Sequence, residues 1–126
     1  MQPNTFVWNE LMTTDTDKAG RFYAAMFGWS TKSVEMADGM RYTLFQRNGE
    51  DVGGMIKMDG PQFQGVPPHW MTYVAVEDVD ATAAKARSAG GTIIVAPFDV
   101  PTVGRMAVVT DPTGAPLSFI KFSMPM

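Results

Sequence analysis

Residues 6–28, FVWNELMTTDTDKAGRFYAAMFG, contain a strand that is followed at once by a helix. Residues 6–13 are predicted to form a strand, and successive side chains of a strand point to opposite faces. Trp8, Glu10 and Met12 therefore share one face of the predicted strand. A carboxylate among large apolar side chains makes that face the first place to look for a function.

The helix is predicted from its ends and its apolar stripe. Asp15 and Asp17 place negative charge at the positive end of a helix dipole. Gly28 is a typical residue just past a helix end. Between them the apolar residues recur at helical spacing on one side, at Ala19, Phe22, Tyr23, Met26 and Phe27.

Three short strands are expected next, at residues 29–36, 40–47 and 52–58. The turn residues Asn48 and Gly49 favour a tight hairpin between the last two. Residues 59–68 hold three prolines and two glycines, which indicates a linker.

The same order of elements then repeats. A strand is expected at residues 69–76, a helix capped by Asp78 and ended by Gly90 and Gly91, and strands at residues 92–96, 105–110 and 116–121. Residues 111–114, DPTG, form a turn signal between the last two strands. We therefore predict a single α+β domain over residues 1–126, with a βαβββ module at about 5–58, a linker at 59–68 and a second module at about 69–122. The two modules are expected to form a cupped mixed sheet.

Composition narrows the function classes. The chain has 126 residues, 45% of them hydrophobic, and no cysteine, so disulfides and thiolate chemistry are excluded. A net charge of −3 and the lack of a basic stripe argue against nucleic acid as a partner. No apolar run approaches the roughly 20 residues that cross a bilayer, and no signal peptide is recognised, so we expect a cytoplasmic protein without a membrane partner.

Three stretches resemble the vicinal oxygen chelate superfamily, which includes glyoxalases, bleomycin resistance proteins and extradiol dioxygenases. They are residues 22–29 (FYAAMFGW), 89–92 (AGGT) and 110–117 (TDPTGAPL), and the resemblance covers nearly the whole chain. It implies the fold of two βαβββ modules. It does not fix an activity, because the family includes isomerases, lyases, dioxygenases, epimerases and binding proteins.

The resemblance also implies where a divalent metal would be held: by side chains from the first and last strands of each module. Those positions fall on Trp8, Met71 and Ser118, while residues 52–57 (VGGMIK) offer no carboxylate. A site of this kind needs three or four nitrogen or oxygen ligands. His69 and Glu10 become ligands only if the alignment is shifted. We therefore expect no metal and no other cofactor.

Without a metal, we predict that the cup between the modules binds a small apolar or aromatic organic ligand, because Trp and Tyr suit stacking and a few polar groups fix orientation. By alternation, the expected ligand-binding residues are Trp8, Glu10, Met12, Met71, Tyr73 and Ser118, with Met55 and Met106 as further candidates.

Two interpretations of Glu10 remain open. In the first, Glu10 is functional, as a general base with a raised pKa or as an anchor for a cationic or hydroxylated ligand. In the second, it is paired with Arg105, Arg41 or Lys57 or lies at a solvated rim. Tyr73 is either a proton donor or a structural phenol. Glu10 and Tyr73 are accordingly the candidate catalytic residues of the alternative hypothesis, a glyoxalase-type lyase or isomerase or a dioxygenase-related enzyme. A homodimer is expected, with Trp29, Phe63 and Trp70 as interface candidates.

Overall fold

The computed structural model describes residues 2–35, 41–101 and 103–123, except for the side chain of Gln62. The chain divides into two compact units. The first unit is Trp8–Met71, and the second unit is Thr72 onward together with the residues before Trp8. Each unit combines one long helix with a four-stranded set of strands.

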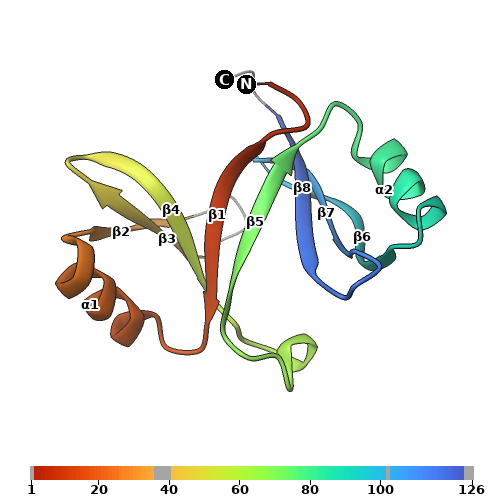
Figure 1. Ribbon diagram of the computed structural model, residues 1–126. Helices are drawn as coiled ribbons and strands as arrows, with labels where there is room; N and C mark the ends of the chain where they lie inside the picture. The colour runs from red at the N-terminus through yellow and green to blue at the C-terminus, as the bar shows by residue number, and fades with distance from the viewer. Residues whose placement is uncertain (1, 36–40, 102, 124–126) are drawn as a thin grey trace. The chain divides into compact units, whose positions relative to one another are not determined.

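The first unit contains β1 (Phe6–Thr13), α1 (Thr16–Phe27), β2 (Ser30–Glu35), β3 (Arg41–Arg47), β4 (Glu50–Lys57) and a short 3-10 helix, η1 (Pro61–Phe63). Its strands lie in the order β2-β3-β4-β1, with β1 and β4 parallel and the other neighbours antiparallel (Figure 1). Asn48 and Gly49 adopt positive φ angles of 52° and 80° in the turn between β3 and β4. That is the hairpin that the sequence predicts.

The ends of α1 follow from its capping residues. The Asp15 side chain accepts a hydrogen bond from the Lys18 amide at 3.0 Å, which satisfies one of the donors left unpaired at a helix start. Gly28 adopts a left-handed conformation, with φ of 74°, and its amide donates to the Ala24 carbonyl. A residue with a Cβ is strained in that conformation, so glycine ends the helix here.

The second unit contains the larger part of β5 (His69–Ala75), whose residues up to Met71 belong to the first unit, and α2 (Val79–Ser88), β6 (Thr92–Val100), β7 (Gly104–Thr110) and β8 (Pro116–Phe122). Its strands lie in the order β5-β8-β7-β6, and α2 lies against β6, β7 and β8 (Figure 1). The chain start joins this unit, because the Asn4 amide donates to the Ala75 carbonyl and the Ala75 amide donates to the Thr5 carbonyl.

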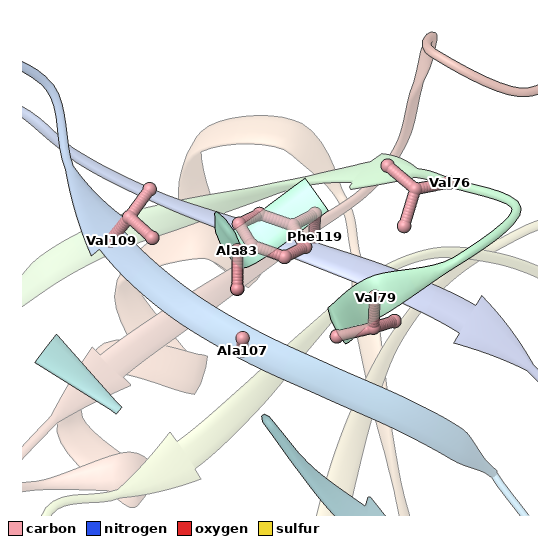
Figure 2. Packing of buried hydrophobic residues seen from close by; sticks show 6 residues of the cluster. All are labelled: Val76, Val79, Ala83, Ala107, Val109 and Phe119. Atoms are coloured by element: carbon pink, nitrogen blue, oxygen red, sulfur yellow. The ribbon is translucent and has the colours of Figure 1, made fainter. Parts of the chain in front are cut away.

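Each unit has its own apolar core under its helix. In the second unit, Figure 2 shows the six residues of the core cluster, Val76, Val79, Ala83, Ala107, Val109 and Phe119. In the first unit, Leu11, Phe45 and Met55 are buried, with Ala19, Tyr23 and Trp29 packed against them. The helix-facing side of each sheet is thereby used for packing, which leaves the opposite side for other roles.

The predicted fold class is confirmed: the protein is α+β, built from two βαβββ modules. The largest boundary error is in β6, which runs to Val100 instead of ending at Ala96, and β4 begins at Glu50, two residues earlier than predicted. Pro97 suggests a strand end, but β6 is an edge strand with register shifts on both sides of Val95, where a missing amide donor is tolerated. The predicted strand ends at Met36 and Met40 lie outside the described residues. Within the described part of the chain, no helix has the length and apolarity needed to span a membrane.

Candidate functional site

The face of the first unit that is turned away from α1 carries the most informative side chains. Leu11 on β1 packs in the core under α1, so its neighbours Glu10 and Met12 point to the opposite side. Trp8 lies on this side too. Glu10 is only 5% exposed, and a buried carboxylate is costly unless hydrogen bonds or charges compensate it.

Hydrogen bonds link Glu10 to Tyr42 and Trp8. The Tyr42 hydroxyl donates to Glu10 Oε2 at 2.6 Å, and the Trp8 indole Nε1–H donates to the Tyr42 hydroxyl oxygen at 2.9 Å. Both contacts bridge distant parts of the sequence, from β1 to β3. We call these three residues the Trp8–Tyr42–Glu10 chain.

Gly54 on β4 makes this chain sterically possible. β4 lies between β3 and β1, and Gly54 is in register with Glu10 on one side and with Leu44 on the other. A Cβ added to Gly54 would overlap the hydroxyl and Cζ of Tyr42 and lie 2.9 Å from its Cε2. The Tyr42 ring therefore crosses β4 over the bare backbone of Gly54.

The donor and acceptor roles in the chain are fixed by chemistry. An indole N–H can only donate, so the Tyr42 oxygen accepts from Trp8 and its single proton is directed to Glu10. Oε2 of Glu10 therefore accepts the hydrogen bond from Tyr42. Hydrogen bonds to charged groups are short and strong, and successive bonds polarise one another.

Tyr42 and Gly54 were not predicted as site residues from the sequence. The available signal is that Tyr42 and Leu44 share one face of β3, opposite to that of the buried Phe45. In the sequence, Gly53 and Gly54 indicate only that this strand offers no carboxylate for a metal. Contact across three strands depends on pairing and register, which a sequence pattern does not supply.

The second unit also has a face turned away from its helix. Ser118 pairs in register with Tyr73 on β5 and Val108 on β7, whereas its neighbour Phe119 packs in the core under α2. The Ser118 side chain is fully buried, and its Oγ has no hydrogen-bond partner within the described residues. Tyr73 is buried on the same face, and Met106, one residue before the core residue Ala107, is half-buried there.

The remaining predicted site residues are more scattered. Met12 is half-buried on the Glu10 face of β1, and Met71 is buried on β5, two residues from Tyr73. Met55 packs in the first unit's core with Leu11 and Phe45, so the structure does not bring it to the Glu10 face. His69 is half-buried, and its Nδ1 lies 2.9 Å from the Pro67 carbonyl oxygen.

The residues at the expected metal positions do not fit a divalent ion. The Trp8 nitrogen carries a hydrogen that it donates to Tyr42, Met71 offers a thioether, and Ser118 a neutral hydroxyl. Hard divalent ions prefer carboxylate, carbonyl or water oxygens, and Zn, Ni and Fe also take imidazole. No group of three or more His, Cys, Asp or Glu side chains that could hold a metal occurs in the parts of the chain that the structure describes.

Arg105, which the sequence suggests as a possible partner of Glu10, is bonded to two aspartates instead. Its guanidinium makes two hydrogen bonds to Asp80, at 2.8 and 3.0 Å, and lies 3.2 Å from Asp99. The bond from Arg105 holds the pKa of Asp80 below its ordinary value.

Asp78 caps α2 by accepting from the Ala81 amide. The aspartates expected to begin helices are thus structural where these bonds are seen.

The other aromatic residues gather on the α1 side of the first unit. The Tyr23 ring contacts those of Trp29, Phe45 and Trp70, and its hydroxyl accepts from the Trp70 indole at 3.2 Å. Trp70 remains 41% exposed, whereas Trp29 is half-buried. Phe63, also expected at an interface, is half-buried in η1.

The chain matches a known protein family and is similar to named proteins. The model of the Glyoxalase/Bleomycin resistance protein/Dioxygenase superfamily matches residues 5–119. A Mycobacterium tuberculosis protein provisionally named glyoxylase CFP32 is 46% identical over 120 residues, which are 95% of this chain and 45% of CFP32. The anthracycline biosynthesis protein DnrV of Streptomyces peucetius is 33% identical over 124 residues, covering 90% of this chain and 45% of DnrV. The chain thus spans a little under half the length of these curated relatives.

A solved structure with a similar fold is a variant of Streptomyces coelicolor methylmalonyl-CoA epimerase in complex with 2-nitronate-propionyl-CoA. Its TM-score is 0.67, its sequence identity is 16%, and the match covers 98% of this chain and 100% of the epimerase chain. At that identity the likeness extends to the fold and no further.

Proposed function

The chain belongs to the Glyoxalase/Bleomycin resistance protein/Dioxygenase superfamily, and from this premise we propose that it binds a small apolar or aromatic organic molecule without the family's metal. The binding face is the one that carries the Trp8–Tyr42–Glu10 chain. The buried carboxylate of Glu10, held by a tyrosine and a tryptophan, is the observation on which the proposal rests.

The composition of this face supports a planar ligand. Trp8 and Tyr42 offer aromatic surface, and Met12 offers an adaptable apolar side chain. Ligand sites are generally apolar with a few polar groups that fix orientation, and Glu10 provides such a group. Tyr73, Ser118 and Met106 on the helix-opposed face of the second unit, and Met71 at the end of the first unit, stay candidate ligand contacts that the sequence predicts.

The test is a thermal-shift screen in buffer with EDTA, using planar aromatic compounds that include tetracyclic anthraquinones. A ligand that binds the folded state raises the Tm by mass action. The Glu10→Gln and Trp8→Phe variants should each lose most of that rise. Glu50→Gln, a matched change at an exposed glutamate of β4, should keep it. If no compound of the panel raises the Tm, the proposal is wrong.

The metal-free part of the proposal has its own measurement. It is supported by the presence of Trp8, Met71 and Ser118 at the expected ligand positions. Elemental analysis of untagged protein should find Ni, Zn, Mn and Fe well below one ion per chain. One equivalent of any of these metals, retained after gel filtration, would contradict it.

A second candidate function is a glyoxalase-type lyase or isomerase in which Glu10 is the base. It is favoured by the short hydrogen bond from Tyr42 to a buried carboxylate and by the 46% identity to CFP32. The assay supplies a 2-oxoaldehyde with a thiol and follows thioester formation. Glu10→Gln should abolish turnover and Tyr73→Phe should reduce it, whereas unchanged turnover in both would exclude these residues from catalysis.

We also propose that two copies of the chain associate. Phe22, Met26 and Phe27 on α1 are between 46% and 57% exposed, and α1 has no buried residue. Exposed apolar side chains gathered on one helix are typical of an interaction surface. Sedimentation equilibrium should give about twice the chain mass of 13.8 kDa. The double variant Phe22→Ser with Phe27→Ser should give the mass of a single chain. The cytoplasmic location remains a prediction, which cell fractionation tests.

A further inference from the structure

Tyr42 reaches Glu10 from a strand that is not adjacent to β1. β3 carries Tyr42 and β1 carries Glu10, and β4 runs between them. We propose that Tyr42 is a positioning residue for the Glu10 carboxylate, and that Gly54 is the position that admits it. This inference rests on the proposed function only in taking Glu10 as the group that meets the ligand.

A hydrogen bond of fixed direction reaches the carboxylate from Tyr42, and a second one, from Trp8, orients Tyr42. Trp8 donates to Tyr42, which leaves the Tyr42 proton to be given to Glu10 Oε2 at 2.6 Å. Trp8 therefore acts on Glu10 through Tyr42. A glutamate side chain has three rotatable bonds, and a bond to one of its oxygens restricts all of them.

Gly54 controls whether this arrangement can form. A methyl group at this position would occupy the volume of the Tyr42 hydroxyl and ring edge. The tyrosine would then have to leave its place even though Tyr42, Glu10 and Trp8 were all unchanged. Position 54 therefore determines the site without itself touching a ligand.

The positioned carboxylate favours a particular class of ligand. The hydrogen bond from Tyr42 to Oε2 holds the Glu10 carboxyl group in one orientation. It is suited to an aromatic or apolar molecule that carries an N–H, an O–H or a positive charge at one edge. A molecule whose only polar groups are acceptors would leave this buried carboxylate without a new partner and would bind more weakly.

The experiment is carbon NMR of free protein labelled at the glutamate side-chain carboxyls, at one neutral pH. The chain has four glutamates, so the spectrum is simple, and the Glu10 signal is identified by its loss in Glu10→Gln. We expect Tyr42→Phe and Gly54→Ala to shift the Glu10 signal more than any other glutamate signal. Trp8→Phe should shift it less, and should have no further effect when Tyr42 is already phenylalanine.

Two outcomes would overturn the positioning role. One is a Glu10 signal that is unchanged in Tyr42→Phe, and the other is a Trp8→Phe shift that persists in the double variant. Gly20→Ala, the same substitution at a glycine of α1 where an added Cβ meets only Thr31 Cγ2 at 3.4 Å, should leave the signal in place. Tyr42→Phe keeps the shape of the ring, so the test stands even if Gly54→Ala fails to fold. Because free protein is used, a failed ligand screen would not change these signals.

Discussion

Replacing Gly54 by alanine should destabilise the protein through Tyr42, a residue on another strand. The added Cβ would overlap the Tyr42 hydroxyl and Cζ, so the ring must move off β4. When it moves, Glu10 loses its hydrogen bond from the phenol and Trp8 loses its acceptor. The backbone at Gly54 does not have a positive φ angle, so alanine itself meets no strain there.

The size of the effect can be worked out bond by bond. A hydrogen bond to a charged group contributes about 1.5–3 kcal/mol and a neutral one about 1 kcal/mol. The Gly→Ala change offsets about 0.5–1 kcal/mol of this loss, because it reduces the freedom of the unfolded chain. The net loss is about 2.5 kcal/mol. With an unfolding entropy of roughly 2.1 cal/mol/K per residue over 126 residues, this lowers the Tm by about 10 °C.

A double-mutant cycle with Tyr42→Ala separates the steric cause from others. Urea unfolding followed by circular dichroism gives the free energy of each of the four proteins. In the Tyr42→Ala background the ring is absent, so Gly54→Ala should be neutral or slightly stabilising. If Gly54→Ala costs the same about 2.5 kcal/mol in both backgrounds, the glycine is needed for its own backbone and the reasoning is refuted.

Three further predictions concern other parts of the chain. Ser118→Ala should raise the free energy of unfolding by about 1 kcal/mol in urea titrations, because it removes a buried hydroxyl that has no hydrogen-bond partner among the described residues. A loss of stability would show that the hydroxyl is bonded. Asp80→Asn should lower stability at pH 7 more than Asp99→Asn does. Arg105 lowers the pKa of Asp80 in the folded protein. The stability that the pair contributes is therefore complete above the pKa of aspartate in the unfolded chain, near 3.9, and is lost as the pH falls below it. Urea denaturation at pH 3 should show a smaller difference in stability between Asp80→Asn and the wild type than at pH 7. Asp15→Ala removes the cap of α1 and should cost about 1 kcal/mol, with a matching loss of helical circular dichroism on heating.

Much of the fold could be predicted because local chemistry decides it. Asp15 and Gly28 bound α1, and Asn48 with Gly49 turns the chain between β3 and β4, as the sequence indicates. Each of these residues acts on its own neighbours, so a pattern a few residues long contains the information. The strand that contains Pro97 was predicted too short, since its tolerance of proline depends on lying at the sheet edge.

The site was only partly predictable for the opposite reason. Alternation along one strand placed Trp8 and Glu10 on a common face. Met55 was grouped with them, but pairing of β1 and β4 sets Met55 beside Leu11 in the core. Tyr42 was missed because its hydroxyl reaches a residue 32 positions away, across a strand that lies between. Register between strands decides both cases, and the sequence of a single strand does not contain it.

Residues 52–57 have a role in the structure that the sequence does not indicate. The sequence predicts only a strand without the carboxylate that a metal site requires. In the structure, the absence of a side chain at Gly54 is what lets Tyr42 cross β4 and bond to Glu10. The carboxylate on β1 is then held by a phenol and, through it, by an indole, both neutral groups. We expect a site built in this way to select ligands by hydrogen bonding and aromatic contact, so that Gly54 and Tyr42 affect what the protein binds although neither stands at an expected metal position.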